Sequence, residues 1–376
     1  MQSLRILIMT HAPLSPEFGA GQMTINLGEA FRELGHDVTL WSSHPVPQSN
    51  FNIFSLFQHI WTARKKFDCF LANEAVFDII DCSAVYISKQ VLRSGTIVVS
   101  RSVQPEVLYL IHDLFQTSNF RNLLRKPFDI IDILLYTFYL IQGWQRASLV
   151  LCLGSLGFEW TKNKVPWISK KLDYYVNALA SKEQQLLSKI RIDRKLNLSD
   201  SVRFLWVGRW SSHKGTSMLV KFILEQTNVR PDDSFTIAGC GSSAENDIPS
   251  HLIDSGRVKI IPTFDREDLY SLLAEHDVGL FTSKVEGWGL VLNEMLESGM
   301  NVYATNAGGV VDLMPLFPNL LRSFPVQSTI SNQNNHDFRD SNWQKYYEHF
   351  TWTSIANHYL NQSAISSKLT QSEGKI

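Results

Sequence analysis

The stretch Asp277–Asp312 constrains the fold of this chain more than any other, because it alternates short apolar runs with glycine-containing loops. The apolar run that ends at Phe281 is bounded by polar residues and has the length of a buried strand. Apolar residues within Leu290–Leu296 recur with helical spacing, and Gly299 is a typical helix stop. A second strand-like run, Val302–Ala304, leads into another glycine loop. The pattern predicts strand, acidic glycine loop, helix, strand and glycine loop, as in an α/β sheet of parallel strands.

The loop before the predicted helix is a candidate phosphate site. In open α/β sheets, ligands bind beyond the carboxyl ends of strands, and helix N-termini there accept anions. A phosphate would lie above Gly287–Gly289, flanked by Glu286 and Glu294, whose carboxylates can accept hydrogen bonds from vicinal hydroxyls. For each glutamate alone the alternative is a solvated surface position, and Asn293 and Glu297 are expected to form the polar stripe of the helix. The combination predicts a phosphorylated sugar or a nucleotide as ligand.

Composition limits the remaining possibilities. With 376 residues the chain can form two domains of ordinary size, and 44% hydrophobic with 19% charged residues is typical of a globular protein. A formal net charge of −1 gives no general reason to expect a nucleic-acid partner. The four cysteines lack the close spacing of a zinc site or redox motif, which favours reduced thiols in a cytoplasmic protein. The first apolar run, Leu4–Met9, is too short for a signal peptide or membrane span.

The N-terminal half continues the alternation of strands and helices. Leu4–Met9, Gln22–Leu34 and Val38–Trp41 predict a strand, a helix and a strand. The loop before this helix contains Gly19 and Gly21 and is long, so it is a second candidate phosphate loop, with ordinary turn chemistry as the alternative. Further strands are expected at Cys69–Ala72, Ile97–Ser100 and Leu149–Leu153, which extends a doubly wound pattern.

Polar residues follow the expected strand Ile97–Ser100. Arg101 and Glu106 lie at its carboxyl end, where substrates bind in such sheets. We therefore expect these two residues on the acceptor side of the site.

The segment Asn119–Trp144 joins basic residues to an apolar run that is too short to span a bilayer. One interpretation is a helix lying on a membrane surface, which would suit a lipid-linked acceptor. The other is a core helix of the first domain, because Asp129 and Asp132 would face an anionic surface unfavourably.

In the second half, two basic residues follow the strand expected at Ser201–Val207. Arg209 comes directly after Gly208, and Lys214 lies a few residues further on, before Gly215. A diphosphate needs positive charge, which a planar guanidinium and a flexible ammonium can both supply. For either residue alone, the alternative is a surface salt bridge.

These residues together resemble a known family. Glu286-Gly-Trp-Gly-Leu-Val-Leu-Asn-Glu294, with seven residues between the glutamates, is similar to the signature of the retaining glycosyltransferases of family 4, which adopt the GT-B fold. The pairs Gly208-Arg209, Lys214-Gly215 and Gly308-Gly309 also resemble that family. The likeness covers nearly the whole chain. Where related enzymes often carry a histidine, however, this chain has Val103.

The resemblance implies an α/β fold of the GT-B type, with two doubly wound Rossmann-like domains that face a central cleft. Residues 1–176 would form the N-terminal, acceptor-side domain, and 177–345 the donor domain. A helix at 346–361 would cross back to the first domain, and 362–376 would form a mobile tail.

The resemblance also assigns roles. Arg209, Lys214 and Glu286 would be catalytic, the two cations neutralising the leaving nucleoside diphosphate and Glu286 contacting the donor sugar. Glu294 would hold the ribose hydroxyls. The other donor-binding positions would be Gly19, Gly21, Gly208, Gly287, Trp288, Gly289 and Leu290.

The implied reaction moves a sugar from a nucleoside-diphosphate sugar to the hydroxyl of a glycan, a lipid-linked acceptor or a small molecule, with retention of configuration. No metal or cofactor is expected, and the sequence contains no Asp-x-Asp. The protein would act in polysaccharide or glycoconjugate biosynthesis, in the cytoplasm or peripherally at the inner face of the membrane.

Other functions compete with this one. An NAD-dependent oxidoreductase would need a Gly-x-Gly-x-x-Gly motif after the first strand of a domain, and neither half has one. A non-catalytic nucleotide-sugar-binding protein would keep the same motifs without turnover. An epimerase or a phosphorylase on the same fold would need no separate acceptor or would use free phosphate. The sequence leaves the sugar, the base and the acceptor open.

Overall fold

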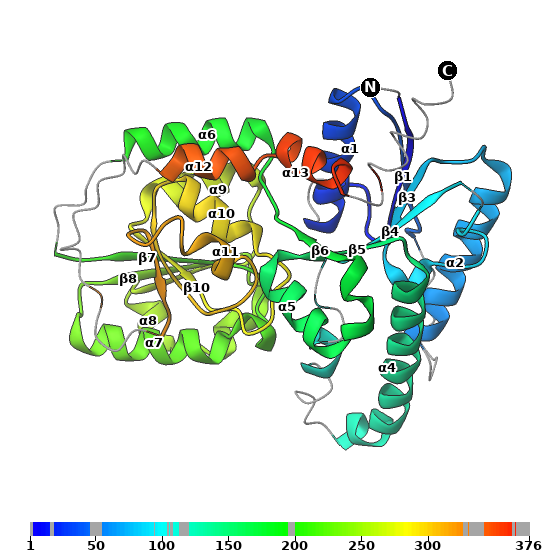
Figure 1. Ribbon diagram of the computed structural model, residues 1–376. Helices are drawn as coiled ribbons and strands as arrows, with labels where there is room; N and C mark the ends of the chain where they lie inside the picture. The colour runs from blue at the N-terminus through cyan, green and yellow to red at the C-terminus, as the bar shows by residue number, and fades with distance from the viewer. Residues whose placement is uncertain are drawn as a thin grey trace. The chain divides into compact units, whose positions relative to one another are not determined.

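Figure 1 shows the computed structural model of the protein. The chain divides into two compact units, and each is described by itself. Unit 1 comprises Met1–Asn177 and Phe350–Ile376, and unit 2 comprises Ala178–His349. The structure describes residues 3–15, 19–45, 55–93, 95–103, 105, 108–112, 120–194, 200–325, 330, 342–362 and 365. Among these, no helix is both long enough and apolar enough to cross a membrane.

Unit 1 is built on a parallel sheet with the strand order β2-β1-β3-β4-β5-β6. Its strands are β1 (Arg5–Thr10), β2 (Asp37–Ser42), β3 (Ile79–Cys82), β4 (Ile97–Arg101), β5 (Leu149–Leu153) and β6 (Leu172–Tyr175). Its α-helices are α1 (Gly19–Glu33), α2 (Ser55–Asn73), α4 (Phe120–Arg146), α5 (Gly154–Lys164) and α13 (Trp352–Leu360), and its 3₁₀ helices, labelled η, are η1 (Ala84–Tyr86) and η2 (Pro166–Lys171). The order reverses at β1 and β3, so the switch point of this sheet lies between these two strands.

Two local predictions in unit 1 were wrong. Cys69–Ala72 is the end of helix α2 and not a strand, because Ile60, Ala63, Phe67 and Leu71 are buried at helical spacing. The strand of this region is β3, which begins several residues later. Helix α1 starts earlier than predicted, so the glycines expected in the preceding loop belong to its first turn.

Unit 2 has a second parallel sheet, with the order β12-β11-β10-β7-β8-β9. Its strands are β7 (Arg203–Val207), β8 (Ser234–Ala238), β9 (Val258–Ile261), β10 (Val278–Phe281), β11 (Asn301–Ala304) and β12 (Leu321–Ser323). Its helices are α6 (Ser181–Asp193), η3 (Ser212–Lys214), α7 (Thr216–Val229), η4 (Gly241–Asn246), α8 (Ser250–Asp254), α9 (Arg266–Glu275), α10 (Leu290–Glu297), α11 (Val310–Leu313) and α12 (Asn342–His349). The switch point lies between β7 and β10, which places the loops after these two strands next to each other.

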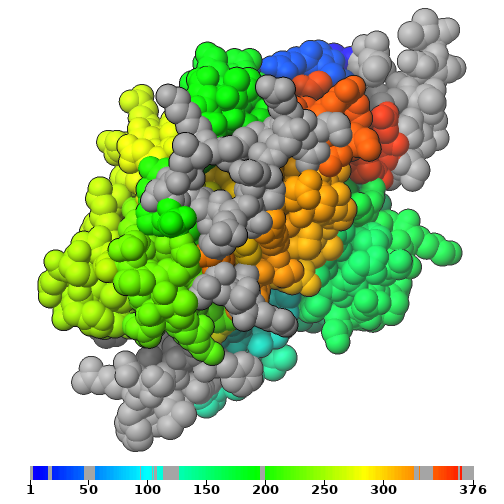
Figure 2. Space-filling model, turned by 90° about the vertical axis from the view of Figure 1, so that its left-hand side faces the viewer, coloured from blue at the N-terminus to red at the C-terminus, as the bar shows by residue number. Residues whose placement is uncertain are grey.

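The strands of unit 2 form its core. Phe204, Leu205 and Trp206 of β7 are buried, as are Leu280 and Phe281 of β10. Such continuous apolar runs are typical of strands covered on both faces. In the space-filling view, residues of unit 2, coloured green to orange, form a large part of the visible face (Figure 2).

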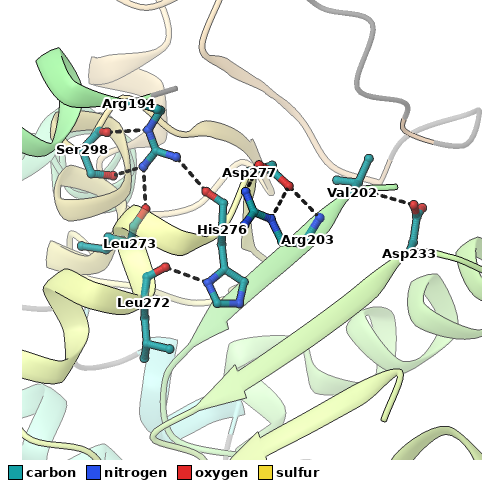
Figure 3. A network of polar contacts seen from close by, with 9 residues as sticks. All are labelled: Arg194, Val202, Arg203, Asp233, Leu272, Leu273, His276, Asp277 and Ser298. Carbon is teal, nitrogen blue, oxygen red and sulfur yellow. Dashed lines mark hydrogen bonds and ion pairs between the residues drawn. The ribbon is translucent and has the colours of Figure 1, made fainter. Parts of the chain in front are cut away.

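Arg194, just after α6, ties the ends of two other helices together (Figure 3). Its guanidinium donates to the carbonyl oxygen of His276 at 2.7 Å and of Ser298 at 2.8 Å, after the last turns of α9 and α10. Burial lowers the pKa of Arg194 to about 10, so the group remains charged at neutral pH. These bonds satisfy carbonyl groups that helix ends leave open, and they fix α10, which carries part of the site.

The helix expected at 346–361 is interrupted. It consists of the end of α12, in unit 2, and of α13, in unit 1. Thr351 separates them because its side chain accepts a hydrogen bond from the amide of Ser354 at 3.2 Å and caps α13. Within unit 1, α13 packs on α1 through Phe31 and Tyr359, whose ring centroids lie 5.2 Å apart. The predicted tail lies outside the described residues, apart from Gln362 and Ile365.

Candidate functional site

The loop after β7 presents the predicted arginine. Gly208 continues the strand pairing, since its amide donates to the carbonyl of Ala238 at 2.9 Å. Arg209 follows and is exposed to solvent. Its guanidinium has no hydrogen-bond or ion-pair partner within the described part of the chain, so it can meet an anionic ligand.

Lys214 and Glu286, which the sequence places far apart, form an ion pair between Lys214 Nζ and Glu286 Oε2. Both side chains are mostly buried, with 18% and 12% exposure. Ser283 donates a hydrogen bond to the same Glu286 oxygen at 3.1 Å. The structure therefore brings a predicted cation and a predicted carboxylate together at the carboxyl ends of β7 and β10.

Backbone contacts hold this pair in place. Thr282 Oγ1 donates to the carbonyl of Lys214 at 2.7 Å, and the indole of Trp206 donates to Thr282 Oγ1 at 3.0 Å. The amide of Lys284 donates to the carbonyl of His213 at 2.7 Å. A Cβ at Gly215, which has φ +70°, would lie 1.9 Å from the carbonyl oxygen of Thr282. The two loops thus pack so closely that only glycine fits at this position.

The loop before α10 is fixed from two sides. Gly289 caps the helix with φ +88°, a conformation that favours glycine. Trp288 is buried, and its carbonyl accepts from the amide of Gly309 at 2.9 Å. A Cβ at Gly308 would lie 2.4 Å from that carbonyl oxygen. Gly287 is also buried, and the burial of Trp288 keeps its side chain out of reach of a ligand.

The amino end of α10 carries features of an anion site. Leu290 is its first residue, and no side chain caps the helix. The first amides of a helix carry partial positive charge and lack partners within it, so they favour a negatively charged ligand.

Glu294 lies one turn into α10 and is 3% exposed. Its Oε1 atom pairs with Arg266 Nη2 at 2.5 Å, and the same Arg266 nitrogen lies 2.6 Å from Glu183 Oε1. Burial raises the pKa of Glu294, and Arg266 opposes this shift. Arg266 and Glu183 were not predicted as site residues, because nothing in their local sequence connects them to Glu294.

A buried hydrogen-bond chain also escaped the sequence analysis. The indole of Trp288 donates to Asn293 Oδ1, the Asn293 amide donates to Tyr346, and the Tyr346 hydroxyl donates to Glu297 Oε1, each at 2.7 Å. Asn293 and Glu297 were expected to form a polar surface stripe, but both are buried. These two polar side chains can be buried because Tyr346 of α12 forms hydrogen bonds with both of them. Burial raises the pKa of Glu297 to about 7.

The predicted positions in unit 1 are described separately. Gly19 is the exposed first residue of α1, whereas Gly21 is buried. A Cβ at Gly21 would lie 2.2 Å from the carbonyl oxygen of Pro13, so the close contact of this glycine is with its own loop.

Arg101, expected on the acceptor side, is buried in the core of unit 1. Its Nε donates to both carboxylate oxygens of Asp81 at 2.9 Å, and Tyr359 donates to the same Asp81 at 3.0 Å. These bonds tie β3, β4 and α13 together and give Arg101 a structural role. Glu106 lies outside the described residues, and Val103 is half-buried after β4.

Comparison with known proteins finds a family model that matches part of the chain, including the unit 2 site. Residues 188–315, which include Arg209, Lys214, Glu286 and Glu294, match the model of the glycosyl transferases group 1. The uncharacterized glycosyltransferase YqgM of Bacillus subtilis is 30% identical over 136 residues, which is 35% of this chain and 36% of that protein. The GPI3 subunit of phosphatidylinositol N-acetylglucosaminyltransferase of Saccharomyces cerevisiae is 23% identical over 159 residues, 42% of this chain and 34% of that protein. The match spans about a third of the length of these curated relatives.

Solved structures match over nearly the whole chain. Sucrose-phosphate synthase of Thermosynechococcus elongatus superposes with a TM-score of 0.60 at 15% identity and covers 99% of this chain and 98% of its own. Anabaena Alr3699/HepE, solved with UDP and glucose, has a TM-score of 0.51 at 15% identity, with 99% and 100% covered. Together with the two parallel six-stranded sheets, these matches show the expected GT-B fold. The chain thus has the GT-B fold, and its residues 188–315 match the model of the glycosyl transferases group 1.

Proposed function

We propose that this protein transfers a sugar from a nucleoside-diphosphate sugar to an acceptor hydroxyl, with retention of configuration and without a metal ion. The observation that carries the proposal is the convergence of Arg209, the Lys214–Glu286 pair and the amino end of α10 at the switch point of unit 2. These groups come from two segments that are far apart in the sequence, the loops after β7 and β10, and a common ligand accounts for their meeting at one edge of the sheet.

The chemistry follows from the charges. Breaking the bond between the sugar and the diphosphate develops negative charge on the leaving oxygens, and preorganised cations and amides stabilise it. Arg209 is exposed and carries a bidentate fork suited to phosphate oxygens. The amides at the start of α10 supply a second positive region. Lys214 can join them by exchanging its contact with Glu286 for a phosphate oxygen.

The two carboxylates take different partners in this proposal. Glu286, released from Lys214, accepts hydrogen bonds from hydroxyls of the donor sugar. Glu294 accepts from the ribose hydroxyls, which requires the ionised carboxylate that Arg266 helps to maintain.

The relatives support a nucleotide-sugar donor. HepE was solved with UDP and glucose, and the yeast relative is named as an N-acetylglucosaminyltransferase. UDP-glucose and UDP-N-acetylglucosamine are therefore the first donors to test. The acceptor is a glycan, a lipid-linked molecule or a small molecule that bears a free hydroxyl.

The test measures release of nucleoside diphosphate from a panel of nucleotide sugars, with and without candidate acceptors. Arg209→Ala and Lys214→Ala should each lower turnover about a hundredfold, as expected when one preorganised charge donor is lost. Lys221→Ala is the matched control, because this lysine of α7 is 76% exposed and its ion-pair partner among the described residues is Glu225, 3.7 Å away across one turn.

The outcomes separate an enzyme from a binding protein. Turnover by the wild type that survives in both site variants would refute the assigned roles. Tight nucleotide binding without turnover across the panel would instead favour a non-catalytic nucleotide-sugar-binding protein. Release of product with the opposite anomeric configuration would refute retention alone.

A further inference from the structure

Helix α4 of unit 1 has two opposite faces of different character. One face packs into the core through residues spaced four apart, including Asp132, Tyr136 and Leu140, all of which are buried. The opposite face carries Ile130, Ile131, Leu134 and Phe138, all of which are exposed. We call these four residues the α4 stripe. Leu134 and Phe138 are 63% and 58% exposed, which is high for large apolar side chains.

The sequence argued against contact between α4 and a membrane because of its two aspartates, and the structure places one of them on the core face. Asp132 does not face solvent, because its carboxylate accepts hydrogen bonds from the amides of Leu56 and Phe57 at 3.1 and 3.2 Å. These amides belong to the first turn of α2, so Asp132 caps that helix. Asp129 is half-buried and is the other acidic residue of α4. Of the two aspartates that argued against contact with an anionic surface, only Asp129 therefore still does so.

Helix α2 extends the apolar surface. Phe57 contacts the ring of Tyr139 at a centroid distance of 5.9 Å, and the Arg64 guanidinium lies 4.7 Å from the same ring. Trp61 follows Phe57 by four residues and precedes Arg64 by three, a spacing that puts the three on one side of the helix. It is 51% exposed, and the Lys65 ammonium lies 3.6 Å from the centre of its ring. A tryptophan beside a lysine suits the boundary between lipid headgroups and acyl chains, because each has an apolar body and a polar end.

The charge of α4 matches an anionic surface. The sequence places Arg121, Arg125 and Lys126 in its first two turns, against one acidic residue that is not committed to the core, Asp129. In Figure 1 the amino-terminal part of α4 extends beyond the sheet of its own unit. Basic residues in the turns that precede an apolar stripe of the same helix favour the interface of an anionic bilayer.

We propose that the α4 stripe docks unit 1 on the surface of an anionic lipid bilayer, with α4 lying in the plane of the interface. From Ile130 to Phe138 the stripe extends about 12 Å along the helix axis, at 1.5 Å per residue, and its side chains reach only the outer part of the acyl region. The basic residues in the first turns of α4 would contribute nothing to the binding of a neutral partner, which favours an anionic surface as the occupant.

The experiment measures flotation of the full chain with vesicles of phosphatidylcholine and with vesicles that also contain phosphatidylglycerol. The double variant Leu134→Glu/Phe138→Glu tests the stripe. Ile192→Glu/Val229→Glu, which alters two similarly exposed apolar residues of unit 2, is the matched control. Thermal unfolding of both variants verifies that the substitutions leave the fold intact.

We expect the wild type and the control to float with the anionic vesicles, and the stripe variant to partition about tenfold or more weakly, since two buried apolar contacts become charges near anionic lipid. Wild-type protein that does not float, or a stripe variant that floats like the control, would overturn the proposal. So would a wild type that is a dimer in light scattering and a stripe variant that is a monomer, because the stripe would then join two copies. The assay contains no nucleotide sugar, so its result is independent of the proposed transfer reaction.

Discussion

Arg266→Gln is the most informative single change in unit 2, because Arg266 is the charge partner of the buried Glu294. One guanidinium nitrogen lies 2.5 Å from Glu294 Oε1 and 2.6 Å from Glu183 Oε1. Glu294 is 3% exposed, whereas Arg266 is 43% exposed. Loss of one partner of a fully buried ion pair costs about 3–5 kcal/mol. Since solvent reaches Arg266, we reduce the expected loss to about 2 kcal/mol.

The loss should depend on pH. Burial raises the pKa of Glu294, so the folded state holds this proton more tightly than the unfolded chain does. The cost of the buried charge is thus absent at low pH and appears as the pH rises through the unfolded and then the folded pKa. Without Arg266, which lowers this pKa, the cost is larger. The variant should therefore be least stable relative to the wild type at pH 8, and the difference should shrink toward pH 5.

Thermal unfolding followed by circular dichroism measures this effect. For a domain of 150–250 residues, 2 kcal/mol corresponds to a midpoint about 4–8 °C lower. The double variant Arg266→Gln/Glu294→Gln should recover part of the loss at pH 8, because no unpaired carboxylate remains. Lys221→Gln breaks an exposed pair and should change the midpoint little. An equal loss at pH 5 and pH 8, or no recovery in the double variant, would refute the electrostatic reasoning.

Two further predictions concern the same unit. Gly215→Ala should cost about 2 kcal/mol more in denaturant unfolding than Gly241→Ala, since both glycines have positive φ but only at Gly215 would a Cβ meet backbone, at the carbonyl of Thr282; equal losses would contradict the steric argument. Glu297→Gln should flatten the pH dependence of stability: the pKa of Glu297 is raised to about 7, so wild-type stability should fall by about 3 kcal/mol between pH 4.5 and pH 8, which midpoints of both proteins across that range would verify.

The sequence predicted those features of the site that depend on local chemistry. The glycines at 215 and 289 have the positive φ values that mark them as obligatory, and the spacing of Glu286 and Glu294 places one in the loop and one in the helix. The failures arose where the deciding partner is remote. The short apolar run Cys69–Ala72 fits a strand and the end of a helix equally well, and only the packing of the whole of α2 decides between the two. In the same way, no partner for Asp132 could be predicted from the sequence, because the amides that it caps begin α2 about 75 residues earlier in the chain.

The remote partners also change how the charges of the site should be counted. By sequence, Arg209 and Lys214 oppose Glu286 and Glu294, which would leave the donor site neutral. The structure pairs Lys214 with Glu286 and places Arg266 between Glu294 and Glu183, so with Arg209 these six side-chain charges still cancel as a set. Among the described residues, however, the Arg209 guanidinium has no carboxylate beside it, so Arg209 and the amino end of α10 form a local positive region. A diphosphate can therefore be attracted before Lys214 leaves Glu286, and exchange of that pair then delivers a cation to the phosphate and a carboxylate to the sugar in one step. It follows that Lys214→Ala should weaken turnover more than nucleotide binding, whereas Arg209→Ala should weaken both.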